Sequence, residues 1–168
     1  MKRVLVIGCC GAGKSTFSRK LQNLTGLDVI HLDQEYWHPD WVETEKVLWE
    51  SKVEALTQRE SWIIDGNYYG TLDVGLKRAD TVFFIDIPTL KCLWRVTKRV
   101  WKYHGTERPD MPPGCKERFD LEFFHFVATF NLRNRKETYE KLEKFKKEKK
   151  IIILKNDDQS EQFLANLI

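Results

Sequence analysis

One short stretch near the amino terminus constrains this chain more than any other feature. Residues 8 to 15 read Gly-Cys-Cys-Gly-Ala-Gly-Lys-Ser and fit the pattern G-x-x-x-x-G-K-[ST] at every fixed position. A β-branched apolar run, Arg3 to Ile7, comes before the stretch, and Phe17 and Leu21 follow it with helical spacing. Strand, glycine loop and helix is the order that a phosphate-binding loop requires, so the stretch predicts an α/β fold.

The residue types in this loop fit the binding of a nucleoside triphosphate. Glycines allow several backbone N–H groups to approach phosphate oxygens at once, and the following helix adds the positive end of its dipole. We expect Lys14 to reach the β- and γ-phosphates and the Ser15 hydroxyl to ligate Mg²⁺. The expected nucleotide-binding residues of the loop are Gly8, Gly11, Ala12, Gly13, Lys14, Ser15 and Thr16. A loop that binds phosphate without turnover is the alternative.

Length and composition indicate a single globular domain spanning residues 1–168. Apolar residues make up 42% of the chain and charged residues 32%, as in ordinary soluble proteins. No apolar segment approaches the length needed to cross a bilayer, so we expect a cytoplasmic protein without a membrane partner. The net charge of +3 is concentrated in a basic stretch from residue 133 to residue 150.

The cysteines show no spacing typical of a zinc site or a disulfide framework. Cys9, Cys10, Cys92 and Cys115 are therefore expected to be free thiols. Cys9 and Cys10 have two interpretations: small residues at variable loop positions, or thiols that a helix amino terminus makes oxidisable.

Two further apolar runs end in carboxylates. Residues 27–33 read as a second strand closing on Asp33, and residues 61–65 as a third closing on Asp65 before Gly66. Ligands of open α/β sheets lie beyond the carboxyl ends of the strands, so both acids are expected near Lys14. Asp33 is expected to orient an acceptor hydroxyl or take its proton, with an N-cap as the alternative. Asp65 is expected to hold Mg²⁺ through water.

The segment between these strands, residues 34–60, is expected to bind the phosphate acceptor. Its first part is aromatic and polar and is interrupted by Pro39, and residues 43–60 have the pattern of an amphipathic helix. The aromatic side chains can stack on a flat substrate or form a small hydrophobic cluster. The acceptor-binding residues that we expect are Asp33, Tyr36, Trp37, Gly66 and Asn67.

The remaining chain alternates strand and helix signals around a loop. Residues 80–88 read as a fourth strand, and in the helix over 90–103, Arg95 and Arg99 share a face that meets either the triphosphate or solvent. Residues 105–115 are a loop by composition, and 117–150 read as a long helix. Together, residues 104–136 predict a lid whose Arg133 and Arg135 close over the γ-phosphate as catalytic groups. A fifth strand over 151–154 and a helix over 159–168 complete the chain. The pattern is that of a three-layer α/β domain with a parallel five-stranded sheet.

With these residues in view, the chain resembles the nucleotide-kinase branch of the phosphate-loop NTPases. More narrowly it is similar to bacterial FlaR-type proteins, often labelled DNA topology modulation proteins. The stretches that carry the resemblance are Gly-Lys-Ser-Thr at 13–16, His-Leu-Asp at 31–33 with Tyr36-Trp37, residues 62–68, residues 78–82, and residues 108–111 ahead of Gly114-Cys115.

This resemblance implies an adenylate-kinase-like sheet of order 2-3-1-4-5, ATP and Mg²⁺ in the loop, and a helical lid after strand four. Asp65-Gly66 is similar to the Asp-Gly of adenylate kinases, and Arg95 and Arg99 to their helix arginines. Asn67-Tyr68 replaces the Pro-Arg that adenylate kinases carry further along, which argues against AMP as the acceptor.

Three functional hypotheses follow from the sequence. The first is an ATP-dependent kinase that phosphorylates a small molecule or nucleotide. The second is a nucleotide-dependent DNA-binding regulator, supported by the basic stretch although glutamates are interspersed in it. The third is an NTPase whose hydrolysis controls contact with a partner. The sequence does not name the acceptor or the oligomeric state.

Overall fold

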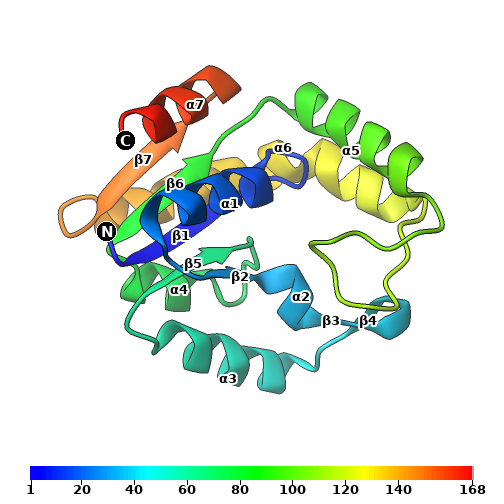
Figure 1. Cartoon of the computed structure of the whole chain (residues 1–168), viewed down its shortest axis with the longest axis horizontal. Coiled ribbons are helices and arrows are strands. Elements are labelled where there is room, and N and C mark those ends of the chain that lie inside the picture. The colour runs from blue at the N-terminus through cyan, green and yellow to red at the C-terminus, as the bar shows by residue number, and fades with distance from the viewer. Residues whose placement is uncertain (168) are drawn as a thin grey trace.

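The computed structural model describes residues 1–167, and a parallel sheet lies at its centre (Figure 1). The strand order is β2-β5-β1-β6-β7. The strands are β1 (Arg3–Gly8), β2 (Val29–His31), β5 (Trp62–Asp65), β6 (Thr81–Ile85) and β7 (Lys150–Leu154). The numbers differ from the expected order because a small antiparallel hairpin, β3 (Trp37–His38) with β4 (Val42–Glu43), lies outside the sheet and was not foreseen. With the hairpin set aside, the order is 2-3-1-4-5, and the expected fold class is confirmed.

Helices cover both faces of the sheet and give the molecule its three layers (Figure 1). They are α1 (Lys14–Thr25), α2 (Leu32–Tyr36), α3 (Lys46–Thr57), α4 (Leu72–Arg78), α5 (Thr89–Tyr103), α6 (Leu121–Phe145) and α7 (Asp157–Ala165). A 3₁₀ turn, η1 (Pro39–Trp41), links the two strands of the hairpin. The closing helix begins at Asp157, two residues before the expected start, and the expected end at Ile168 lies outside the described residues.

The core consists of two buried clusters, one on each face of the sheet. Successive residues of β1 alternate between them, because side chains of a strand point to opposite faces: Val4 packs in one cluster and Leu5 in the other. Helices α1, α5 and α7 supply the first cluster, and α3 and α4 the second. Helix α6 contributes to both, with Val127 in the first and Leu142 in the second. The long helix therefore passes from one face of the sheet to the other.

Several expected boundaries were wrong, and two of them bear on the site. The second strand ends at His31, and Asp33 lies in the first turn of the short helix α2. At this turn Leu32 packs directly on Gly66, where an added Cβ would lie 2.6 Å from the Cβ of Leu32.

The long helix also begins later than expected. Residues 117–120 are not helical, and the backbone of Glu117 pairs with Gly105 and Thr106 through hydrogen bonds of 2.9 and 2.8 Å. Helix α6 starts only after Asp120, whose side chain caps it by accepting from the N–H of Phe123 at 3.1 Å. Within the described residues, no helix is both long and apolar enough to cross a membrane.

Candidate active site

The glycine loop between β1 and α1 is pressed tightly against helix α5. Gly11 has a φ of 80°, and a Cβ added there would lie 2.6 Å from the carbonyl oxygen of Cys92. Gly13, the N-cap of α1, also has a left-handed backbone, with a φ of 99°. Because side chains rarely adopt this conformation, these positions explain the glycines of the pattern. The loop therefore presents its backbone at the amino terminus of α1.

Lys14 extends back over this loop. Its ammonium donates a hydrogen bond of 3.1 Å to the carbonyl oxygen of Cys9. Burial alone lowers the pKa of Lys14, but nearby negative charge, including that of Asp65 and Asp33, outweighs burial, so the net shift is upward. The side chain stays charged at neutral pH, as an anion-binding lysine must.

Asp65 lies at the end of β5, beside the loop. The carboxyl group is buried, and its Oδ2 is 2.8 Å from Nδ1 of His31, the last residue of the neighbouring strand β2. Its Oδ1 is also buried and has no hydrogen-bond partner within residues 1–167. A buried carboxylate oxygen without a protein partner fits a water of a metal shell. Ser15, in the first turn of α1, fits the hydroxyl ligand of the same ion.

Asp33 is held by a residue that the sequence analysis did not assign to the site. The hydroxyl of Tyr68 donates to Oδ1 of Asp33 at 2.6 Å. Burial, together with Asp33, raises the pKa of Tyr68, so its hydroxyl keeps its proton. Tyr68 directly follows Asn67 in the stretch that carries the family resemblance, and that adjacency was the available signal. Both polar atoms of the Asn67 side chain are buried without an aligned hydrogen bond from the described part of the chain.

The aromatic residues of the 34–60 region pack against one another. The ring centroid of Tyr36 lies 5.0 Å from that of Trp37, 4.9 Å from that of Trp49 and 4.6 Å from that of Tyr68. Trp41 and its neighbour Asp40 both have a φ of 62°, a left-handed backbone that is costly for a bulky residue. Of the two interpretations, the small aromatic cluster is observed, and stacking on a substrate stays a prediction.

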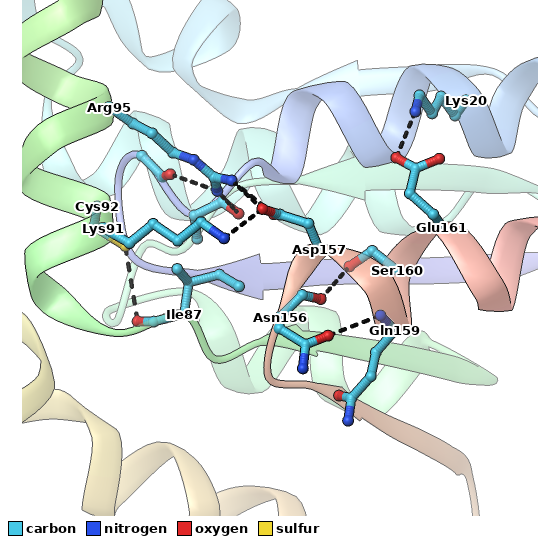
Figure 2. Close-up of polar contacts among 12 residues, drawn as sticks. Lys20, Ile87, Lys91, Cys92, Arg95, Asn156, Asp157, Gln159, Ser160 and Glu161 are labelled. Carbon is cyan, nitrogen blue, oxygen red and sulfur yellow. Dashed lines mark hydrogen bonds and ion pairs between the residues drawn. The ribbon is translucent and has the colours of Figure 1, made fainter.

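Helix α5 carries Arg95 to the open side of the loop (Figure 2). The Arg95 guanidinium donates to the carbonyl oxygens of Gly11 and Ala12 at 3.4 and 3.2 Å and to both carboxylate oxygens of Asp157 at 2.7 and 2.6 Å. Lys91 adds a second cation to Asp157 at 2.5 Å. These contacts border a cavity of about 330 Å³ between the loop and α7; its lining includes Thr16, Phe17, Lys20, Ser160 and Glu161.

Arg99 does not share this environment, although it lies one turn further along α5. Its Nε is 3.1 Å from Oε2 of Glu117, and Nε of Arg108 is 2.8 Å from the same oxygen. Arg108 also reaches Asp110 at 3.3 Å. The sequence did not indicate that Arg108 and Glu117 belong to this cluster, because charged residues in and beside a loop rich in Pro and Gly are expected to be solvated. Burial and Arg108 lower the pKa of Arg99, while Glu117 raises it.

The loop that carries Arg108 closes over the expected acceptor region. Side-chain nitrogens of Gln34 and Trp41 donate to the carbonyl oxygens of Pro109 and Lys116 at 3.1 and 2.9 Å. The N–H of Asp40 donates to the carbonyl oxygen of Gly114 at 3.1 Å. The loop and the hairpin therefore touch, and the expected lid and the expected acceptor region lie side by side.

The two expected lid arginines lie elsewhere on α6. Arg135 makes a bidentate pair with Asp86, just beyond the end of β6, through bonds of 2.8 to 3.1 Å, and Tyr139 donates to the same carboxylate at 2.7 Å. The pairing raises the pKa of Arg135. Arg133 is exposed. Arg135 is thus engaged by a carboxylate and is not a free cation over the loop. The catalytic role of both arginines stays a prediction.

The loop cysteines are buried or half-buried free thiols. Burial raises the pKa of Cys10, and a contact with Cys92 followed by burial raises that of Cys9. Raised pKa values disfavour the reactive thiolate, so the structure favours the packing interpretation of both residues.

Comparisons with known proteins place this geometry within one fold. No protein-family model and no curated protein matches the chain. Among solved structures, shikimate kinase from Acinetobacter baumannii in complex with shikimate has a TM-score of 0.62 at 19% identity, covering 99% of this chain and 90% of that one. Deoxyadenosine kinase from M. mycoides with products has a TM-score of 0.54 at 18% identity, covering 98% and 97%. Shikimate kinase from Bacteroides thetaiotaomicron gives 0.55 at 15% identity, covering 99% and 96%.

The chain has the adenylate-kinase-like phosphate-loop fold. At these identities the likeness shows the fold and no more. The narrower resemblance to FlaR-type proteins stays a prediction.

Proposed function

We propose that the protein is an ATP-dependent kinase that transfers the γ-phosphoryl group to a small acceptor. The observation that carries the proposal is the placement of three residues at the carboxyl ends of neighbouring strands: Lys14 follows β1 through the loop of the phosphate-binding pattern, Asp65 ends β5, and Asp33 follows β2. A lysine that holds phosphate, an acid placed for an acceptor and an acid placed for a metal are the parts that phosphoryl transfer requires. The similar solved structures named above are kinases, which supports the same reaction class.

In this proposal the backbone of the loop and Lys14 bind the triphosphate. The lysine leaves the carbonyl oxygen of Cys9 and neutralises charge on the β- and γ-phosphates as the transition state develops. The cavity beside Arg95 takes the nucleoside part of ATP, since it opens directly from the loop. The aromatic lining contributed by Phe17 suits a flat base.

Ser15 and Asp65 would hold Mg²⁺, the first through its hydroxyl and the second through a water on its unpaired Oδ1. The ion supplies charge neutralisation at the phosphate oxygens when it is bound.

The acceptor is proposed to lie between Asp33 and the closing loop. Asp33 accepts a proton from the acceptor hydroxyl or orients that hydroxyl, and Tyr68 keeps the carboxylate in place. Residues 34–60 form the acceptor wall, and residues 104–136 act as the lid, because the loop part of the second segment contacts the hairpin part of the first.

The test is ATP consumption by the purified protein against a panel of nucleosides, nucleotides and hydroxylated metabolites. We expect one acceptor to accelerate ADP release and to emerge phosphorylated. Lys14→Ala should lower kcat/KM for ATP by a factor of about 10³ or more, because the main cation on the migrating group is lost.

Lys77→Ala, on the exposed last turn of α4, is the matched control and should behave as wild type. Undiminished turnover in a folded Lys14→Ala protein would exclude the loop from catalysis. ATP binding without any modified acceptor would favour the slow NTPase instead.

The DNA-binding alternative gains no support from the basic half of α6. Lys136, Lys141 and Lys146 each pair with a glutamate one turn away on the same helix, at 3.8, 3.6 and 3.2 Å. Pairing of this kind reduces the positive charge that these three lysines could offer to phosphate groups. Loss of DNA affinity with rising salt is the measurement that would revive this alternative.

A further inference from the structure

A row of exposed apolar side chains runs along α5, at the rim of the molecule (Figure 1), and the proposed kinase function does not use it. Leu90, Trp94 and Trp101 have exposed fractions of 81%, 59% and 86%. Their spacing of four and then seven residues places them on one line along the helix axis, about 16 Å long at 1.5 Å per residue. The side chains that hold α5 in the core lie on another side of the helix and are Cys92, Val96 and Val100. Helix α5 therefore has a second apolar side, the α5 ridge of Leu90, Trp94 and Trp101, which faces solvent.

Every charged residue of α5 is a cation. Residues 89–103 contain no Asp or Glu, and their cations are Lys91, Arg95, Lys98, Arg99 and Lys102. Asp157 pairs with the first two (Figure 2), and Glu117 pairs with Arg99. Lys98 and Lys102 are exposed and have no ion-pair partner within residues 1–167. The solvent-facing part of α5 therefore combines an apolar ridge with two positive charges that the protein does not neutralise.

The two lysines lie beside aromatic rings of the same helix. The ammonium of Lys98 is 4.5 Å from the centroid of the Trp94 ring, and that of Lys102 is 5.0 Å from the centroid of the Tyr103 ring. Tryptophan has an apolar ring with a polar N–H and prefers the boundary between water and an apolar layer. Lysine lays its apolar stem along such a boundary and keeps its ammonium in the polar layer. The ridge and its lysines therefore fit a surface that is apolar beneath and anionic on top.

We propose that α5 docks on the surface of a lipid bilayer that contains anionic headgroups. The α5 ridge enters the boundary between headgroups and acyl chains, and Lys98 and Lys102 lie against the lipid phosphates. Helices that bind in this way carry Trp, Phe or Leu on one side and Lys or Arg next to it. The sequence led us to expect no membrane partner, but that expectation considered only segments long enough to span a bilayer. Docking on one leaflet needs no such segment.

The charge pattern favours a lipid surface over two other occupants. A second copy of the chain would bring α5 against α5 across a two-fold axis, and the lysines would repel because the helix carries no acid. A nucleic acid is held mainly by phosphate contacts, for which Lys98 and Lys102 supply two partners, and the apolar Leu90 gains nothing from a phosphate. An anionic bilayer uses both kinds of side chain at once, because it offers phosphates above an apolar layer.

Co-sedimentation of the purified full chain with lipid vesicles tests the proposal. The probes are vesicles of phosphatidylcholine alone and vesicles in which about a third of the lipid is phosphatidylglycerol. We expect wild type to bind the anionic vesicles, to leave them as salt is added, and to bind the neutral vesicles much more weakly. A wild-type protein that does not bind the anionic vesicles, or that binds both kinds equally, overturns the proposal.

The combination of Trp94→Ala and Trp101→Ala tests the apolar part of the surface. The partition coefficient for anionic vesicles should fall at least about 100-fold, because two large rings no longer leave water on binding. The matched control combines Val47→Ala and Leu48→Ala, which removes exposed apolar side chains from α3 on the other face of the sheet, and it should bind as wild type does. All four residues are exposed, so both variants should fold, as judged by circular dichroism. An unchanged partition coefficient in the folded tryptophan variant overturns the proposal.

The combination of Lys98→Gln and Lys102→Gln tests the charged part. Binding to anionic vesicles should weaken about 30-fold, the factor that corresponds to two lysines leaving an anionic surface. The control combines Lys144→Gln and Lys147→Gln, which removes the same net charge from exposed positions at the carboxyl end of α6 and just beyond it. Equal losses in the two lysine variants would show that net charge and not α5 governs binding, and would overturn the proposal.

Two further measurements identify the other occupants. A dimer in analytical ultracentrifugation that the tryptophan variant dissociates, in a protein that does not bind vesicles, assigns the α5 ridge to a second copy and overturns the proposal. Binding of a fluorescent single-stranded oligonucleotide that the tryptophan variant loses, again without vesicle binding, assigns the ridge to nucleic acid and overturns it as well. None of these results depends on ATP turnover, so this proposal and the kinase proposal fail independently.

Discussion

Arg95 and Arg99, one turn apart on α5, lie in different surroundings. Arg95 borders the open cavity, and its Nη2 donates to both carboxylate oxygens of Asp157, at 2.7 and 2.6 Å. The Asp157 side chain is 44% exposed. Arg99 lies on the closed side, where its contact with the buried Glu117 is 3.1 Å and out of line. Helix α5 therefore contributes to two different sides of the loop. On the open side, which faces the cavity, Arg95 is hydrogen-bonded to a carboxylate. On the closed side, which the loop of residues 105–115 covers, Arg99 contacts a buried carboxylate without an aligned hydrogen bond from its Nε.

The difference indicates how much the ion pairs on each side of the loop contribute to the stability of the fold. Exposed ion pairs contribute about 0–1 kcal/mol, because solvent screens them. Removing one partner of a buried cluster typically costs about 3–5 kcal/mol, because a charge is left unpaired. We therefore expect substitutions on the closed side to change the rate of phosphoryl transfer and the affinity for ligands. Substitutions on the open side should affect only the shape of the nucleotide cavity.

The largest expected effect tests the closed side directly. Asp33→Asn should lower kcat by a factor of about 10²–10⁴ with little change in the KM for ATP, because the proton acceptor is lost while the loop is intact. The Tyr68 hydroxyl can still donate to the amide oxygen, so folding should be retained. Steady-state kinetics with the identified acceptor is the measurement. Asp28→Asn, exposed on the loop before β2, is the control, and equal kcat in both variants would remove Asp33 from the reaction.

A smaller effect is expected where the loop meets α5. Gly11→Ala should lower the free energy of unfolding by about 1–3 kcal/mol, because its Cβ would lie 2.6 Å from the Cys92 carbonyl and the φ is 80°. Urea denaturation measures the change. Gly70→Ala, where an added Cβ meets nothing within 4 Å, is the control. A Gly11→Ala protein as stable as this control would show that the loop can move away from α5.

The smallest expected effect belongs to the open side. Hydrogen bonds from Arg95, and then from Lys91, lower the pKa of Asp157 below its ordinary 3.8. Such a carboxylate stabilises the fold above its unfolded pKa and loses that contribution as pH falls through the lower folded value. Because the group is largely solvated, we expect only a few tenths of a kcal/mol.

The measurement is the change in unfolding free energy on acidification from about pH 6 to about pH 3, where the unfolded carboxylate protonates. Wild type should lose slightly more than Asp157→Asn. A loss of several kcal/mol that is absent from the variant would contradict the contrast between the two sides.

Much of the fold followed from local patterns. The loop and the parallel strands were predictable, because apolar runs, glycines and helix spacing are encoded within a few neighbouring residues. The order of the strands came from the family resemblance and not from these local patterns. The position of Asp65 at the carboxyl edge of the sheet was also predictable, because this residue ends its strand. The hairpin of β3 and β4 was not predictable, because two-residue strands carry no periodic signal and depend on the loop packed against them.

The closed side of the site was the part that sequence missed. Arg108 and Glu117 are separated by a segment rich in proline and glycine, and only the folded loop brings them to Arg99. Arg135 was read as a lid group, but Asp86, remote in sequence, pairs with it. In a linear sequence, charged residues on loops and helices are interpreted as solvated. The sequence does not show which of them are buried by segments that are distant along the chain.

The seam between the closing loop and the hairpin relies on main-chain oxygens. The acceptors for Gln34, Trp41 and Asp40 are the backbone carbonyls of Pro109, Lys116 and Gly114, and the thiol of Cys115 reaches the carbonyl of His38. Every residue type carries a carbonyl, so the loop side of the contacts at Pro109 and Lys116 survives substitution. Gly114 is the exception, because its φ is 86° and an added Cβ would lie 2.7 Å from the Cβ of Pro39. Related sequences can therefore differ at many side chains of this loop, and in acceptor preference, while the loop still closes over the bound molecule.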